Sequence, residues 1–195
     1  VVPMSSCNEF PCKRVGRNGA HHFFGYYNKS NWDPSGRLLL AQEVPWRDAY
    51  LEPNLTARVG YFDMAKDDGA FHAVGETRAW NWQFGSKLQW LGGSASPEVL
   101  YNVRTNDALS RYPFFGAEIR DIHTLERRTL PMPVYVAAPN GEWALSIDYR
   151  RLYVTHETIG YSSDDSQPPP SLCPNDDGIW RMDLNSGDAV LAVSF

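Results

Sequence analysis

Short strand candidates recur along the chain, separated by polar and turn-forming residues. Most are rich in aromatic and aliphatic residues and bounded by Gly, Pro, Asn or Asp, which is typical of β-strands. No window of about a dozen residues keeps the period of about 3.6 that an amphipathic helix requires. We therefore expect an all-β chain. The expected strands are 37–42, 59–63, 87–91, 98–103, 117–122, 134–138, 143–148, 178–184 and 189–195.

A repeated unit predicts the architecture more specifically. Three turn-plus-strand phrases, beginning at Trp32, Trp90 and Ala138, can be laid over one another and start about 50 residues apart. Each is followed by a further strand that ends in an acidic turn. The unit reads strand, tight turn, strand, longer excursion, strand, turn, strand, which is the pattern of a four-stranded β-propeller blade.

A closed propeller typically has four to eight blades, and this chain supplies about three to four at that period. We expect residues 1–195 to form one partial β-propeller domain, with an extension at 1–20 and blades from about His21. The chain would then be the N-terminal part of a longer protein, or be completed by another copy. An open β-sandwich is the alternative, since sandwiches also show frequent turns.

Composition and charge narrow the range of partners. The chain has 195 residues, with 18 Lys and Arg against 23 Asp and Glu, a net charge of −5. It has no Lys- and Arg-rich stripe, so we expect no nucleic-acid partner. Its longest apolar runs are far shorter than the roughly 20 residues that cross a bilayer, so we expect no membrane span. Cys7 and Cys12 could close a small disulfide loop or remain free thiols.

Two groups of residues have the chemistry of a proton-transfer site. His21 and His22 lie together in an aromatic segment, and an imidazole is a suitable general base near neutral pH. Tyr135 and Arg151 flank two expected strands joined by the turn at 139–141, so antiparallel pairing brings them toward one end. An Arg there can hold a carboxylate. The simpler alternative is a packed Tyr, a solvated Arg and unremarkable histidines.

A metal site is the third possibility. His156 and Cys173 are both suitable Zn²⁺ ligands, but a structural site needs four, and only two are evident. Further ligands would come from acids of the polar, Pro-rich loop at 164–177, such as Asp164, or from sequence beyond Phe195.

Several of these segments together resemble a known family. They are His21 to Arg37, Ala79 to Leu91, Tyr135 with Arg151, and Asp177 to Leu184. They resemble the seven-bladed β-propeller polysaccharide lyases, notably the ulvan lyases and rhamnosyl-glucuronate lyases, and more distantly oligogalacturonate lyase. The resemblance covers the chain from about His21 onward and about the first half of such an enzyme.

The resemblance implies β-elimination on a polysaccharide that contains uronic acid. A base removes the C5 proton, the C4–O bond breaks, and a cation neutralises the carboxylate in the transition state. Arg151 would be that cation. His22, or its neighbour His21, and Tyr135 would share the general base and general acid roles.

The resemblance also implies binding residues and a structural metal. Gln42 stands where family members often carry a second histidine, and an amide can bind substrate but cannot transfer a proton near neutral pH. Gln83 and Tyr161 are further expected sugar contacts. His156 and Cys173 would belong to a structural Zn²⁺ site, and no organic cofactor is expected.

These expectations define the leading function and its alternatives. The leading function is a lyase for an acidic polysaccharide or oligosaccharide, secreted or periplasmic because its polymer lies outside the cell. One alternative is a non-catalytic propeller that binds glycans or proteins. Another is an enzyme of the metal-dependent oligogalacturonate lyase type, acting on small intracellular oligomers.

Overall fold

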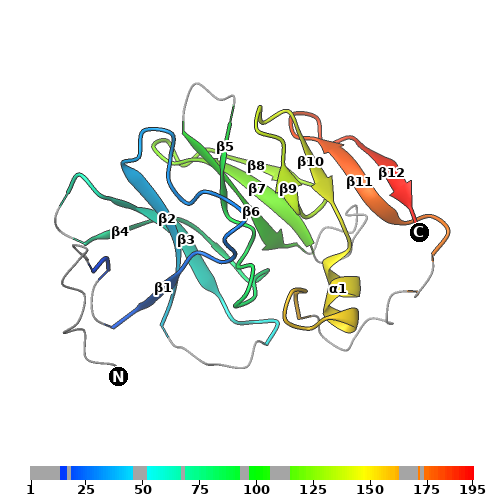
Figure 1. Ribbon diagram of the computed structural model, residues 1–195, viewed down its shortest axis with the longest axis horizontal. Coiled ribbons are helices and arrows are strands. Elements are labelled where there is room, and N and C mark those ends of the chain that lie inside the picture. Colours follow the sequence, from blue (N-terminus) through cyan, green and yellow to red (C-terminus); the bar gives the residue numbers. More distant parts are fainter. Residues whose placement is uncertain are drawn as a thin grey trace.

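The protein is almost entirely β. The computed structural model describes residues 14–16, 19–45, 52–66, 69–92, 97–105, 115–162, 171 and 174–195. Within these residues, 12 strands form three antiparallel four-stranded sheets and one short helix is present (Figure 1). The expectation of an all-β chain is therefore confirmed.

Each sheet contains four strands that are consecutive in the sequence and neighbours in space. The first sheet has the order β1 (His21–Phe23), β2 (Leu38–Val44), β3 (Ala57–Asp63) and β4 (Phe71–Thr77). The second has the order β5 (Gln89–Leu91), β6 (Glu98–Arg104), β7 (Phe115–Asp121) and β8 (Arg127–Leu130). The third contains β9 (Val136–Ala137), β10 (Trp143–Ser146), β11 (Gly178–Asp183) and β12 (Ala189–Ser194).

One helix interrupts this pattern, where the sequence predicted none. Helix α1 (Tyr149–Thr155) follows β10 and begins at Asp148, whose carboxylate accepts hydrogen bonds from the backbone N–H groups of Arg150 and Arg151. These bonds satisfy donors that the first helical turn leaves unpaired. Arg151 therefore lies on a helix and not on a loop. Among the described residues, no helix is long and apolar enough to span a membrane.

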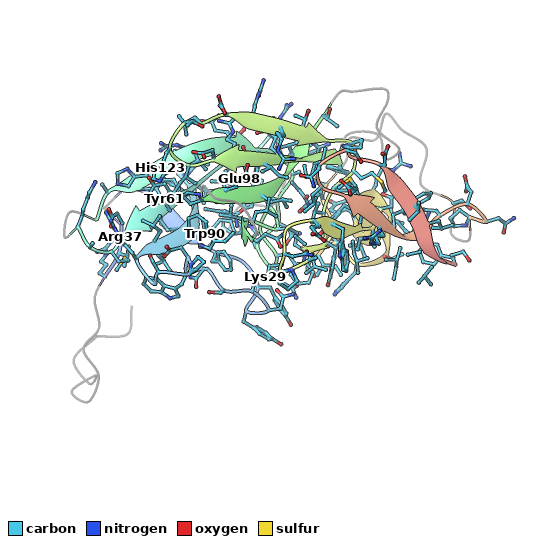
Figure 2. The ribbon with its side chains drawn as sticks, turned by 90° about the horizontal axis from the view of Figure 1, so that it is seen from above. Lys29, Arg37, Tyr61, Trp90, Glu98 and His123 are labelled. Atoms are coloured by element: carbon cyan, nitrogen blue, oxygen red, sulfur yellow. The ribbon has the colours of Figure 1, made fainter. Side chains whose placement is uncertain are left out.

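The sheets pack against one another in sequence order. Leu40, Val59 and Val74 of the first sheet form one buried cluster with Val99 and Tyr101 of the second. Tyr61 and Trp90, labelled in Figure 2, pack against the same cluster. A second cluster joins the second and third sheets. It includes Leu100, Ile119, Ala144 and Met182.

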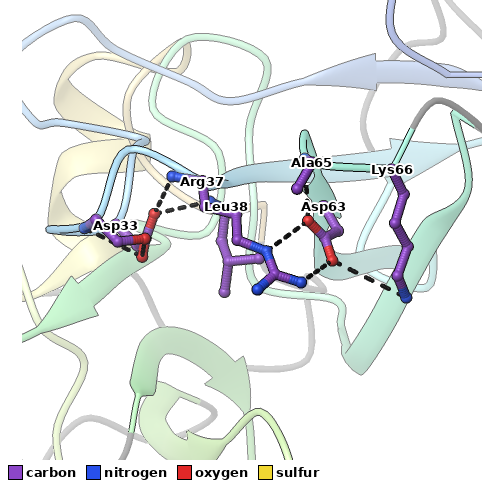
Figure 3. A network of polar contacts seen from close by, with 7 residues as sticks. Asp33, Arg37, Leu38, Asp63, Ala65 and Lys66 are labelled. Carbon is purple, nitrogen blue, oxygen red and sulfur yellow. Dashed lines mark hydrogen bonds and ion pairs between the residues drawn. The ribbon is translucent and has the colours of Figure 1, made fainter.

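A polar network fixes the start of β2 (Figure 3). Asp33 closes the turn before β2, because its carboxylate accepts the backbone N–H groups of Arg37 and Leu38 at 2.8 and 2.7 Å. The Arg37 guanidinium then donates two hydrogen bonds, of 2.8 and 2.6 Å, to the carboxylate of Asp63 at the end of β3. Chiefly because of these bonds, the pKa of Asp63 is lowered to about 2.

This network predicts a pH-dependent contribution to stability. A carboxylate whose pKa is lower in the folded chain stabilises it above the unfolded pKa, here 3.8, and that stabilisation is lost as the pH falls through about 2. We expect Asp63→Asn to lower the free energy of unfolding at neutral pH, and the difference from wild type to shrink toward pH 2. Urea unfolding at a series of pH values measures it. Glu126→Gln, at a side chain with no ion pair among the described residues, is the control. A difference that does not vary with pH contradicts the prediction.

Candidate functional site

Segments from all three sheets meet at Tyr135. Lys29, from the loop after β1, donates a hydrogen bond from Nζ to the Tyr135 carbonyl oxygen at 3.1 Å. The Nζ of Lys87, which lies shortly before β5, is 3.8 Å from the centroid of the Tyr135 ring and 4.1 Å from that of Phe84. The Phe84 ring meets Tyr135 edge to face at 6.3 Å. We call Lys29, Phe84, Lys87 and Tyr135, with the adjacent Tyr26, the Tyr135 site.

The Tyr135 site combines positive charge with aromatic surface. Figure 2 shows Lys29 at the lower edge of that view, on the opposite side of the molecule from His123. A small pocket opens beside it, and none of the described residues that line it is an acid. The lining residues are Phe24, Tyr26, Asn28, Lys29, Phe84, Lys87 and Leu88. Lys29 and Lys87 thus belong to a lining without a described carboxylate, an arrangement of charge that favours an anionic ligand.

Lys87 has two energetically unfavourable features. Its residue is 3% exposed, and its Nζ has no hydrogen-bond partner in the described part of the chain. Its φ of 58° lies in the left-handed region, which costs a residue with a side chain about 1 kcal/mol or more. Residues held in such states are concentrated at functional sites. Contact with the faces of two rings offsets part of the cost of burying the Lys87 ammonium, because aromatic faces attract cations.

Both amines hold their protons less tightly than an ordinary lysine. Burial lowers the pKa of Lys87 to about 8. Burial, and secondly the charge of Lys87, lower the pKa of Lys29 to about 7. Near neutral pH the pair therefore exchanges protons with solvent, and an anion bound beside it would favour the charged forms.

A buried amide holds the segment that carries Lys87. Gln42 is 0% exposed, and its Nε2 donates to the Phe24 carbonyl at 2.7 Å while its Oε1 accepts the Ser86 N–H at 2.8 Å. Gly85 lies against this amide, with a φ of 59°, and a Cβ there would be 1.9 Å from Nε2 of Gln42. Only glycine fits this position, so the close approach fixes the backbone next to Lys87.

A second buried amide holds the backbone next to Tyr135. Asn102, on β6, is 0% exposed. Its side chain donates to the Val134 carbonyl at 2.9 Å and accepts the Val134 N–H at 2.7 Å. The same Nδ2 donates to the Tyr161 hydroxyl, and the backbone N–H of Asn102 donates to the Ser86 carbonyl at 2.7 Å. Asn102 therefore ties the segments before β5 and before β9 to the second sheet.

His22 makes its described ring and ion-pair contacts within the first sheet. Its Nε2 is 2.9 Å from the Glu43 carboxylate, and its ring contacts those of Phe62 and Phe71 at 5.0 and 5.3 Å. His22 and Glu43 are paired on one face of the first sheet, whereas Gln42 points from the other face to the second sheet. His21, on the same strand, is exposed.

In the described part of the chain, Arg151 makes no side-chain contact with Tyr135, although Leu152, its neighbour on α1, packs against the same buried cluster as Tyr135. The Arg151 guanidinium pairs with the Asp177 carboxylate at 3.2 Å, donates to the Ser171 carbonyl, and lies 5.2 Å from the centroid of the Phe195 ring. Among the described residues, no contact joins His22, Tyr135 and Arg151. Their joint action in one site, which the sequence predicted, stays a prediction.

The expected sugar-binding residues differ in accessibility. Gln83 is exposed, in the segment before β5. Tyr161 is 0% exposed, its ring stacked on that of Tyr149 at 4.2 Å. Gln42 and Tyr161 thus have internal roles in this conformation, and their contact with a sugar stays a prediction.

The predicted zinc ligands are placed only in part. His156 is exposed at the C-terminal end of α1, where its N–H donates to the Leu152 carbonyl. Cys173, together with Cys7 and Cys12, lies outside the described residues. Within the described ranges, no group of three or more His, Cys, Asp or Glu side chains is placed to hold a metal ion. The structural Zn²⁺ stays a prediction.

Sequence reasoning missed Lys29 and Lys87. Both lie inside the segments that carry the family resemblance, but a lysine has no special meaning in a sequence unless its burial is known. Comparisons with models of protein families, with curated proteins and with solved structures found no match.

The Asn102 amide predicts a large effect on stability. Asn102→Ala leaves the N–H and C=O of Val134 and the hydroxyl of Tyr161 without this partner, and each unsatisfied buried group costs about 1–3 kcal/mol. We expect the free energy of unfolding, measured in urea, to fall by about 3 kcal/mol or more. Asn140→Ala is the matched control, because Asn140 is exposed and bonds only to Glu142. Equal losses for the two variants contradict the role of Asn102.

Proposed function

We propose that the three sheets are blades of a β-propeller and that the protein cleaves a polysaccharide containing uronic acid by β-elimination. Three consecutive antiparallel four-stranded sheets that pack in sequence order support the propeller. The sequence repeat of about 50 residues supports it independently. In a propeller the first strand of each blade lies nearest the common centre.

The composition of the Tyr135 site carries the functional proposal. Lys29 follows β1, Lys87 precedes β5 and Tyr135 precedes β9, so each comes from beside the first strand of a different sheet. A propeller brings these strands together around its centre, where ligands commonly bind. The site offers the amine of Lys29 for a carboxylate, the buried charge of Lys87 nearby, and aromatic rings for the apolar face of a sugar.

The residues of this site suit the steps of β-elimination. The C5–H bond breaks, its electron pair forms the C4=C5 double bond, and the C4–O bond breaks to release an alcohol. The phenol oxygen of Tyr135, as the phenolate, takes the proton from C5. The resulting phenol then donates that proton to the departing oxygen. One group can serve both steps when the proton and the oxygen lie on one face of the sugar ring. Positive charge close by stabilises the negative charge that develops on the carboxylate.

This proposal assigns the residues expected from the family resemblance different roles in the reaction. Tyr135 keeps its expected role in proton transfer. His22 and Arg151 keep theirs only if the chain or its substrate brings them to the same site, because each has other partners in the structure. A polymeric substrate would place the protein outside the cytoplasm.

Activity on uronate polymers tests this function. The full chain is incubated with ulvan, gum arabic or pectic fragments, and the ultraviolet absorbance of the unsaturated uronate is followed. We expect absorbance to rise with at least one polymer and not with the same polymer after reduction of its carboxylates. Tyr135→Phe should lower the rate about 100-fold or more, as expected for loss of a proton-transfer group. Tyr153→Phe, on α1, is the control.

Two outcomes would contradict parts of this proposal, one the cleavage itself and the other the role of Tyr135. Binding of the polymers without any rise in absorbance would favour a non-catalytic glycan-binding module, the alternative expected from the sequence. A Tyr135→Phe variant as active as wild type would show that another residue transfers the proton.

A further inference from the structure

β-Elimination on a uronate requires a cation at the carboxylate, and the expected one already has partners. The Arg151 guanidinium is paired with Asp177, bonded to the Ser171 carbonyl and in contact with the Phe195 ring. These contacts leave the buried Nε of Arg151 without a hydrogen-bond partner among the described residues, so the guanidinium keeps donors of its own. A substrate carboxylate bound there would, however, lie beside the carboxylate of Asp177, and like charges at that distance repel.

We propose that Lys29, and not Arg151, binds the carboxylate of the uronic acid, next to the phenol of Tyr135. This inference takes its ligand class from the proposed function. Lys29 is half-buried at the pocket, and its single described hydrogen bond, to the Tyr135 carbonyl, leaves two further protons of the ammonium for a ligand. That bond also holds the Lys29 amine at the backbone of the residue proposed to transfer the proton.

Lys87 supports carboxylate binding by Lys29 without contacting the ligand itself. Its Nζ is buried between the rings of Phe84 and Tyr135, so it does not reach a ligand directly in this conformation. Its charge still acts on the pocket, because charges in a poorly hydrated site interact strongly. Lys87 is therefore a positioning residue: it packs against the Tyr135 ring and makes the electrostatic potential at the pocket more positive.

The surroundings of Lys29 predict how binding depends on pH. Besides Lys29, the titratable groups described in the lining of this pocket are Lys87, from the segment before β5, and Tyr26, from the loop of Lys29 itself. Tyr135, from the segment before β9, does not line the pocket but contacts both lysines. None is an acid, so in the free protein nothing at the pocket offsets the loss of hydration that lowers the pKa of Lys29 to about 7. A bound carboxylate supplies the missing negative charge, so binding favours the ammonium form and weakens as the pH rises above the pKa.

Binding of an acidic oligosaccharide tests the inference without depending on cleavage. Calorimetry is performed on the full chain with Tyr135→Phe, which prevents turnover, using a glucuronate-containing oligosaccharide. The same oligosaccharide with its carboxylates reduced, and a sulfated neutral one, are the comparison ligands. We expect Lys29→Met to weaken binding of the glucuronate form about 10- to 100-fold, with little effect on the reduced form.

The conservative variant and a matched control separate a ligand contact from a structural role. Lys29→Arg should restore binding and make it independent of pH between about 6 and 9, because the guanidinium stays charged. With Lys29 in place, the affinity for the glucuronate form should fall as the pH rises from about 6 to 9. Lys66→Met, which removes an exposed lysine on the loop after β3, should leave binding unchanged.

Four results would overturn the inference. They are a larger loss with Arg151→Met than with Lys29→Met, an equal loss for the reduced ligand, tighter binding of the sulfated ligand than of the glucuronate, and no binding of the glucuronate form at all. Because cleavage is measured separately, carboxylate binding by Lys29 without any product formation would refute the lyase and leave this inference standing.

Discussion

Two buried amide side chains hold the segments on which the candidate site depends. Gln42 bonds to the backbone of Phe24 and Ser86, and Asn102 bonds to the backbone of Val134 and Ser86. Ser86 is thus held at its N–H by one amide and at its carbonyl by the backbone of the other residue. Buried backbone groups outside regular strands need such partners, and these amides supply them. The strained backbone of Lys87, the next residue, is accordingly held in place by its neighbours.

The site that results has an electrostatic arrangement that is unusual for a purely structural region. Lys29 and Lys87 line one pocket, and none of the described residues in that lining is an acid. Lys87 lies over the Tyr135 ring, and Lys29 bonds to the Tyr135 carbonyl. Folding has to overcome the loss of hydration at both amines, and the strong packing of three sheets makes that possible. In the proposed function, a uronic acid would place its carboxylate at Lys29 and the apolar face of its ring against the aromatic side chains.

The sequence predicted the fold better than the site, for physical reasons. Strands rich in apolar residues, such as β6, were found, whereas β1 is only three residues long and β8 is largely polar. Helix α1 has seven residues, too few to show a helical period, although Asp148 is a typical N-cap. Tyr135 was identified by its place before a strand. The roles of Lys29, Lys87 and the Gln42 amide arise from burial, which depends on segments far apart in the sequence.

A crystal structure of the Tyr135→Phe variant with a glucuronate oligosaccharide bound would test the convergence of the three segments most directly. It should place the sugar carboxylate within hydrogen-bond distance of Lys29 Nζ, with Lys87 beneath the ring at position 135 and both amide bridges in place. A carboxylate bound to Arg151 with Lys29 turned away from it, or Lys29 and Lys87 on separate surfaces, would contradict the proposed site.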